Sequence, residues 1–246
     1  MTFCLGMKVK QGLVGLADTR VTSGSECITA RKVTVYRQEQ GCMFLMTSGL
    51  RSVRDKSLTY FDEMIAEQEK PFDRLFKAVN AFSSQIRQAA TEDRAALEES
   101  GLTFNMYALV GGQLSGDHEH KLYMIYPQGN WVEVGKGTPY YIIGASGYGK
   151  PVLDRTLKYE DSMHHALKVG CLAFDSTRIS AADVDFPLDV VWFDPKSREI
   201  HEHRYSKDDL MGVSNWWQDY LRQGVHDLPS DWIEEAFSIF PETPDS

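Results

Sequence analysis

The chain opens with MTFCLGMKVKQGLVGLADTR (1–20), in which two apolar runs are separated by a short polar segment. The runs FCLGMKV and LVGLAD have the length and composition of strands, and Lys10-Gln11-Gly12 between them is typical of a turn. We therefore expect an antiparallel hairpin, which would return the end of the second strand to the side of the N-terminus. Asp18 lies at that returning end.

Thr2, directly behind the initiator Met1, is the candidate nucleophile. Removal of Met1 would leave a threonine with both a side-chain hydroxyl and a free α-amine. Because an α-amine titrates at about 7.7–8.0, a fraction is neutral near pH 7 and can accept the hydroxyl proton. N-terminal threonine is a known form of the activated nucleophile. Many chains begin Met-Thr, however, and the alternative is that Thr2 only begins the first strand.

Other residues supply what such a nucleophile needs: a cation, an acid that holds the cation, and N–H groups for an oxyanion. Lys32 in TARKVTVY, at the start of the third expected strand, is the candidate cation, and Asp18 is the candidate acid. Gly49 in MTSGLR precedes an expected helix, whose N-terminus would favour negative charge. Singly, these residues could be a turn aspartate, a surface lysine and a turn glycine. Together with Thr2 they are more specific.

The rest of the chain alternates blocks of strands with pairs of helices. Apolar residues recur at helical spacing from Arg51 to about Gln68 and from near Pro71 to about Ser100. Two more helices are expected from about Gly149 to Tyr159 and from Ser162 to Phe174, with Asp161 or Ser162 as the N-cap. Further strands are expected at 32–38, 42–48, 104–112, 120–127, 130–134, 139–145, 186–194 and 199–205. This order indicates an α+β fold in which sheet packs on sheet, with helices on both outer faces.

Composition limits the possible functions. The chain has 246 residues, 42% of them hydrophobic and 25% charged, which is ordinary for a globular protein with a sizeable core. The net charge of −9 argues against nucleic-acid and anionic-membrane partners. No run of 18 apolar residues and no signal-peptide core is present. The scattered cysteines Cys4, Cys27, Cys42 and Cys171 are typical of reduced thiols, so we expect a cytoplasmic protein.

We also expect no cofactor. The histidine pairs His118/His120, His164-His165 and His201/His203 have no cysteine or carboxylate cluster at metal-ligand spacing, so no zinc site is predicted. The segment GASGYGK (144–150) lacks the glycine and lysine spacing of a phosphate-binding P-loop.

The first fifty residues resemble a proteasome-type β-subunit. The shared features are T-x-x-x-G-x-K at the start, then LVGLADTR, then R-K-V, and S-G before the first helix. The spacing of sixteen positions from Thr2 to Asp18 matches that family. The resemblance implies that Thr2 is the nucleophile, that Lys32 and Asp18 assist it, and that the Gly49 N–H holds the oxyanion.

The second half resembles the same family more loosely. GASGYGK is similar to the segment that opens the family's third helix, which implies that Ser146 lies near the nucleophile. FDSTRIS (174–180) is similar to the segment that supplies an accessory aspartate and serine, and Asp175 matches the aspartate. The serine stays open between Ser176 and Ser180, because Arg178 occupies the position where a serine is usual.

The resemblance also implies where substrate would bind. Thr22 and Gly24, on the strand expected to line the cleft, would pair with substrate backbone as an added strand. Arg31, Met46 and Thr47 fall near positions that shape the first specificity pocket in the related families.

The start without a longer pro-peptide is like HslV, and together with the tryptophan-bearing tail it resembles the bacterial Anbu family of ancestral β-subunits. The resemblance implies a four-layer αββα Ntn-hydrolase sandwich over residues 1–206, with a C-terminal helical extension, 207–246, docked on the same domain. It further implies a homo-oligomer, either a ring or an open helical assembly. An ATPase partner is possible but cannot be read from the sequence.

The activity that we expect is hydrolysis of peptide or protein amide bonds through an acyl-enzyme on Thr2. Two alternatives stay open: an amidase of small acyl-amides with the same nucleophile, and a catalytically weak scaffold that binds peptides or partners. Retention of Met1 would favour the scaffold, because Thr2 would then have no free α-amine.

Overall fold

The computed structural model describes residues 2–23, 26–38 and 41–237, and the chain divides into two compact units, Met1–Asp209 and Leu210–Ser246. The boundary lies three residues beyond the expected end of the first domain at 206. Each unit is described by itself.

Antiparallel pairing builds two five-stranded sheets from the described residues of the first unit. The first sheet has the order β10 (Tyr140–Gly144), β1 (Phe3–Val9), β2 (Gly12–Asp18), β11 (Leu188–Asp194), β12 (Glu199–Tyr205). The second has the order β5 (Val33–Gln38), β6 (Gly41–Gly49), β7 (Met106–Gln113), β8 (Lys121–Ile125), β9 (Trp131–Glu133). Between β2 and β5 lies a short hairpin, β3 (Arg20–Ser23) and β4 (Glu26–Thr29).

The two sheets face each other across an apolar core. Cys4 and Leu13 of the first sheet belong to the same buried cluster as Phe44 and Leu109 of the second. Strands β1 and β2 are buried at every position, as expected for strands covered on both faces. Their continuous apolar runs therefore reflect a sheet that lies between two other layers.

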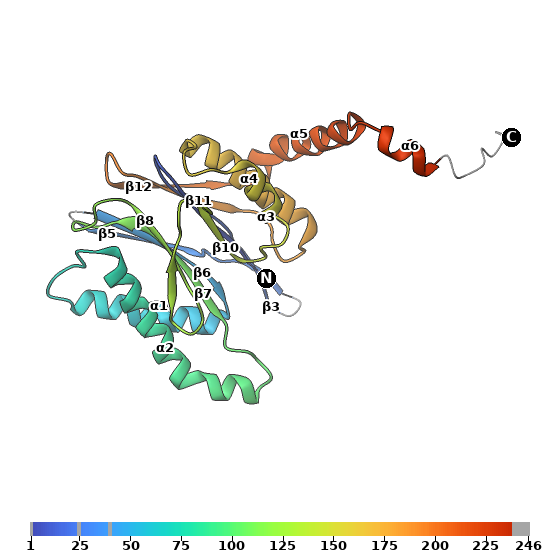
Figure 1. The fold of residues 1–246 in the computed structure, drawn as a ribbon. Helices are drawn as coiled ribbons and strands as arrows, with labels where there is room; N and C mark the ends of the chain where they lie inside the picture. Colours follow the sequence, from blue (N-terminus) through green and yellow to red (C-terminus); the bar gives the residue numbers. More distant parts are fainter. Residues whose placement is uncertain (1, 24–25, 39–40, 238–246) are drawn as a thin grey trace. The chain divides into compact units, whose positions relative to one another are not determined.

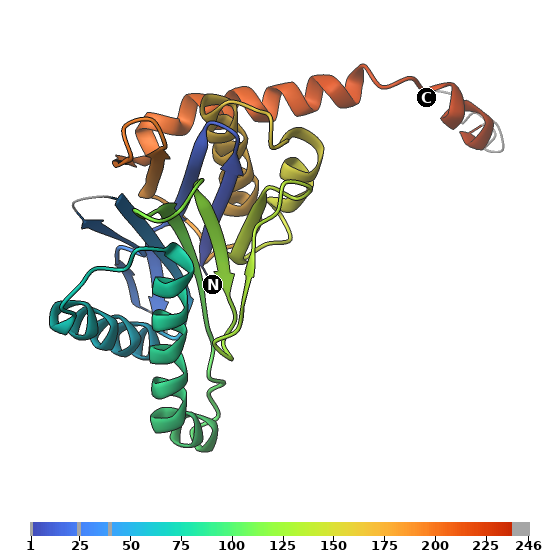
Figure 2. The same cartoon turned by 60° about the vertical axis from the view of Figure 1, so that its left-hand side comes forward.

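Helices cover the outer faces of the sheets (Figures 1 and 2). On the second sheet lie α1 (Arg51–Glu67) and α2 (Leu75–Glu99), whose Phe61 and Phe82 are buried in one cluster with Met43 and Val110. On the first sheet lie α3 (Lys150–Thr156) and α4 (Met163–Ser180), and the Phe174 ring of α4 contacts Phe3 at 5.9 Å between centroids. The first unit thus has the order helices, sheet, sheet, helices.

Helix α2 begins at Leu75, so the prediction of a start near Pro71 was wrong. The residue before it, Arg74, has an extended backbone, and the Leu75 N–H donates to the Asp117 carboxylate at 2.9 Å. Asp117 lies in the loop before β8, so a contact from a distant part of the sequence fixes this helix start.

Helices α3 and α4 also differ in length from the prediction. Helix α3 ends at Thr156 rather than near Tyr159, and α4 continues to Ser180 rather than ending near Phe174. The longer α4 keeps Thr177 fully buried, and the Phe174 ring packs edge-on against Phe186 at 5.0 Å. Burial of these side chains favours continuation of the helix beyond the point that its periodicity suggests.

The second unit continues α5 (Lys207–His226), which begins before the unit boundary, and contains α6 (Asp231–Phe237). Within it the Trp216 and Tyr220 rings stack at 5.2 Å between centroids. Within the part of the chain that the structure describes, we find no helix with the length and apolar character needed to cross a membrane.

Candidate active site

A cavity of about 650 Å³ lies at one end of the facing sheets. It is lined by residues at the start of β1, the end of β6, the start of α1 and the end of β10, together with parts of β3, β7 and β8. The sequence-predicted residues on this lining are Thr2, Lys32, Thr47, Gly49 and Ser146. Segments far apart in the chain therefore meet around Thr2.

The register of β1 with β10 fixes the position of Thr2. Phe3 pairs with Gly144, and the Ala145 N–H donates to the Thr2 carbonyl at 2.7 Å. A Cβ on Gly144, whose φ is +93°, would lie 1.9 Å from that carbonyl oxygen, so a side chain cannot be placed there. Ser146 follows two residues later and lines the same cavity as Thr2.

Asp18 and Lys32 form a buried ion pair beside the first strand. The Lys32 Nζ donates to Asp18 Oδ1 at 2.6 Å and to the Arg20 carbonyl at 2.7 Å. Asp18 Oδ1 also accepts the Phe3 N–H at 2.8 Å, which ties the carboxylate to the residue next to Thr2. The antiparallel hairpin expected from the sequence explains this contact, because its observed register pairs Cys4 with Ala17.

The pair is removed from water: Asp18 is 0% exposed and Lys32 is 4% exposed. Burial raises the pKa of the Asp18 carboxyl, whereas the Lys32 ammonium and the Phe3 N–H act against that rise. Among the described residues, Asp18 Oδ2 has no hydrogen-bond partner. Loss of one partner of a buried ion pair costs roughly 3–5 kcal/mol, so each residue holds the other in place.

Gly49 forms the step from β6 into α1. Its φ is +137°, and a Cβ would lie 2.0 Å from the Asn105 carbonyl oxygen, so the turn requires glycine. The next residue, Leu50, donates its N–H to the same oxygen at 2.9 Å. The cavity wall here consists of Ser48, Gly49 and the first turn of a 17-residue helix.

Asp175 is not among the residues that line the cavity. It lies on α4, is 5% exposed, and pairs with Arg178 at 2.8 Å between Oδ1 and Nη2. Of the two candidate serines, Ser176 donates back to the Leu172 carbonyl, and Ser180 is exposed at the end of α4. Asp175 and Ser176 thus each form a bond to another residue of α4, and none of the three residues lines the cavity.

The residues expected to bind substrate are only partly described. Thr22 lies in β3, opposite Cys27 of β4, and Gly24 lies outside the described residues. Of the three expected pocket positions, Thr47 lines the cavity and Met46 is buried in the core between the sheets. Arg31 pairs with Glu202 and lines a separate cavity of about 430 Å³.

Several residues that line the main cavity were not predicted from the sequence. Three are the arginines Arg20, Arg51 and Arg54, and the aromatic ones are Tyr107, Tyr126 and Tyr141. A signal for Arg51 and Arg54 was present, since both follow Gly49 at i, i+3 spacing and so share a helix face. In the described part of the chain, no group of three or more His, Cys, Asp or Glu side chains could hold a metal ion.

Two facing sheets between helix layers, with Asp18 returned to the residue behind Thr2, define the class of protein as a proteasome-like β-subunit. No protein-family model matches the chain, and no curated protein matches it. The chain belongs to the Anbu family, the ancestral β-subunits, as solved structures of that family show.

Three of these structures cover nearly the whole chain. A Gly-1 mutant of Anbu from Hyphomicrobium sp. strain MC1 has a TM-score of 0.85 and 29% identity, over 93% of this chain and 99% of its own. Anbu from Yersinia bercovieri has a TM-score of 0.85 and 27% identity, over 92% and 97%. Anbu from Pseudomonas aeruginosa, solved as a helical assembly, has a TM-score of 0.86 and 26% identity, over 93% and 97%.

Proposed function

We propose that this chain is an N-terminal threonine hydrolase, a threonine-type peptidase that cleaves amide bonds through an acyl-enzyme on Thr2. The observation that carries the proposal is the buried Asp18–Lys32 pair, whose Asp18 also accepts the N–H of the residue next to Thr2. A buried cation at this position would assist a threonine nucleophile. The start of an ordinary strand does not require a buried cation. The helix, sheet, sheet, helix order supports assignment to the αββα Ntn-hydrolase sandwich.

In the proposed reaction the Thr2 hydroxyl attacks the carbonyl carbon of the substrate. The free α-amine of Thr2 takes the hydroxyl proton and later gives it to the leaving amine, and water then hydrolyses the acyl-enzyme. Lys32 stabilises the developing alkoxide, and the ion pair with Asp18 holds Lys32 in place.

The other residues would have supporting roles. The Gly49 N–H would bind the oxyanion, a contact whose loss costs about 3–4 kcal/mol in enzymes where it has been removed. Ser146 would orient the α-amine and the water. Asp175 would act only indirectly, because its carboxylate pairs with Arg178 and neither residue lines the cavity. Thr22 and Gly24 would pair with substrate backbone.

Intact mass, before and after treatment with a peptide epoxyketone, tests the proposal, because that reagent needs both the hydroxyl and the amine of an N-terminal nucleophile. We expect loss of Met1 and a single adduct on Thr2. Thr2→Ala should give no adduct and should lower peptide turnover by at least about 10³-fold, since removal of a nucleophile has effects of this size or larger. The matched control is Thr91→Ala, an exposed threonine on α2, which should label and turn over like wild type.

Unchanged turnover in the Thr2→Ala variant would refute the mechanism. Met1 retained in the purified protein would instead favour the non-catalytic scaffold, as does one structural observation, the engagement of Asp175 by Arg178. Met1 removed without an adduct would favour the amidase of small acyl-amides.

We further propose that the chain acts as a homo-oligomer, either a ring or an open helical assembly. The support is the helical assembly of the Pseudomonas aeruginosa relative. Whether the sites are enclosed depends on a small rotation at a heterologous interface.

A further inference from the structure

The main cavity has a charge opposite to that of the whole protein. Among the described residues that line it, four are cationic and none is Asp or Glu, although the chain as a whole has a net charge of −9. The four are Arg20, Lys32, Arg51 and Arg54. A cavity lined by one sign of charge attracts ligands of the other sign.

Counter-ions account for only part of this charge. Lys32 is paired with Asp18 at 2.6 Å, and Arg20 with Asp185 at 3.3 Å. Arg51 and Arg54 share a single carboxylate, that of Asp55, at 3.3 Å and 2.7 Å. One positive charge is therefore in excess at the start of α1. Asp55 does not line the cavity.

Of these two arginines, Arg54 is better placed to bind a ligand in the cavity. Its side chain is 13% exposed, whereas that of Arg51 is 56% exposed. Its Nε and Nη2 are directed to Asp55 Oδ1, so its Nη1 has no protein partner among the described residues. Burial raises the pKa of the Cys4 thiol, and the Lys32 and Arg54 charges both oppose that rise. Arg54 therefore acts electrostatically on the start of β1, two residues from Thr2.

Unpartnered polar atoms on the same wall indicate that a ligand or water belongs there. Thr47 is 2% exposed and lines the cavity, and its hydroxyl has no hydrogen-bond partner in the described structure. The Arg20 Nε is also buried and has no hydrogen-bond partner in the described structure. Buried polar groups without partners cost free energy, which a ligand that bonds to them would recover.

The N-terminus of α1 adds to the positive charge of the cavity. Its first turn contains no acidic residue, and its N-cap, Leu50, makes no side-chain cap. The partial positive charge at the start of this helix is thus left without a side-chain anion of its own.

We infer that the cavity selects peptides with an acidic side chain close to the scissile bond, whose carboxylate is bound by Arg54 with help from Arg51. A carboxylate presents two oxygens in a plane, which matches the planar donors of a guanidinium. This inference deepens the proposed function and rests on it for the position of the scissile bond. Arg54 is the specificity-determining residue, and Thr47, Tyr126 and Tyr141 line the same cavity.

The test measures binding in the Thr2→Ala full-length protein, so that no turnover interferes. The ligands are two acetylated, amidated peptides that are identical except for Glu or Gln at one position, titrated calorimetrically at about 50 mM salt, where screening is weak. We expect the Glu peptide to bind about tenfold more tightly, the effect of one charge-assisted contact. Higher salt should reduce that ratio.

Substitutions assign the preference to its residue. Arg54→Gln should abolish the ratio between the two peptides, and Arg54→Lys should keep part of it, because the charge stays while the fork geometry is lost. Arg155→Gln, an exposed arginine on α3 with the same change in net charge, should leave the ratio as in the parent.

Equal affinity for the two peptides, or no binding of the Glu peptide up to about 1 mM, a level weaker than ordinary substrate recognition, would overturn the inference. So would an unchanged ratio in a folded Arg54→Gln protein, as judged by its thermal unfolding. Failure of the proposed function has a different readout, which is the absence of an epoxyketone adduct on Thr2 in the wild-type chain. The ratio of the affinities for the Glu and Gln peptides can be measured even if no adduct forms.

Discussion

At the scale of single residues, His120 shows how burial controls a titration outside the candidate site. It is 5% exposed, and its Nε2–H donates to the Val9 carbonyl at 2.8 Å. Burial lowers the pKa of His120, and Lys8 and Lys121 add to that effect, while the Val9 bond and Glu119 oppose it. The folded protein therefore prefers the neutral imidazole more than the unfolded chain does.

The sign of the stability change follows from that preference. The pKa of His120 in the folded state lies below its value in the unfolded chain, about 6.5. Above pH 6.5 the residue costs nothing, and as pH falls from 6.5 through the folded-state pKa, the free energy of unfolding decreases by at most about 1.4 kcal/mol per pH unit. His120→Gln should remove this part of the pH dependence.

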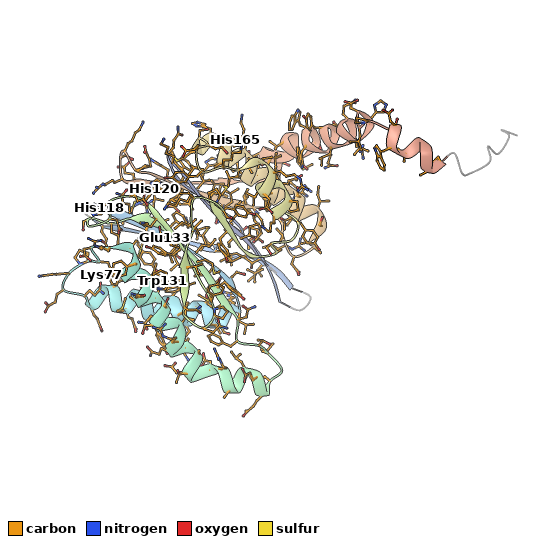
Figure 3. All side chains as sticks on the ribbon, in the orientation of Figure 1. Lys77, His118, His120, Trp131, Glu133 and His165 are labelled. Atoms are coloured by element: carbon orange, nitrogen blue, oxygen red, sulfur yellow. The ribbon has the colours of Figure 1, made fainter. Side chains whose placement is uncertain are left out.

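Urea unfolding between pH 7.5 and pH 5.0 would measure the contribution of His120 to the pH dependence of stability. His118→Gln is the matched control, because His118 is exposed and lies two residues earlier in the chain (Figure 3). We expect the control to keep the wild-type pH dependence of stability. Identical slopes in wild type and His120→Gln would show that His120 does not contribute.

At the scale of elements, the start of α4 depends on one side chain. Ser162 has an extended backbone, and its Oγ accepts the His165 N–H at 3.1 Å. Ser162→Ala should lower the free energy of unfolding by about 1 kcal/mol and the melting temperature by about 2–4 °C. Ser162→Asp should retain most of the stability, because aspartate also caps a helix. Thermal unfolding checks both variants, with exposed Ser180→Ala as control, and a melting temperature of Ser162→Ala equal to wild type would contradict the role of the cap.

Local patterns predicted this helix start, but not every element boundary. The sequence left the N-cap open between Asp161 and Ser162; the structure selects Ser162, while Asp161 accepts the Lys158 N–H. The start of α2 could not be predicted, because it is set by a bond from the distant Asp117. Periodicity reports which face of an element is buried, whereas the ends often depend on contacts from other parts of the chain.

In the candidate site too, some features could be predicted from the sequence and others could not. The placement of Asp18 beside the residue next to Thr2 follows from the first hairpin, so the sequence was sufficient to predict it. The spacing of Arg51 and Arg54 places both on one helix face, but it does not indicate that Arg54 borders a cavity, because an arginine in the first turn of a helix is usually solvated. Only the folded chain shows that it lines a cavity in which, among the described residues, no carboxylate side chain is found.

At the scale of the whole molecule, the second unit exposes a set of apolar side chains. Their exposed fractions reach 58% for Trp216, 59% for Tyr220, 75% for Val225 and 66% for Trp232. The Trp216 and Tyr220 rings are also stacked on each other, and exposed aromatic side chains that gather in this way are typical of interaction sites. With the proposed homo-oligomer, the expected occupant is a second copy of this chain.

Replacing both stacked aromatics, Trp216→Ser with Tyr220→Ser, should therefore weaken self-association. Burial of each ring is worth about 2–3 kcal/mol, so loss of both should raise the dissociation constant on the order of 10³-fold or more. Native mass spectrometry across a dilution series would show smaller assemblies than those of wild type at the same concentration. Leu102→Ser, which changes an exposed apolar side chain of the first unit, should leave the assembly unchanged. If the double variant keeps the wild-type assembly at every dilution, the Trp216 and Tyr220 rings do not join the subunits.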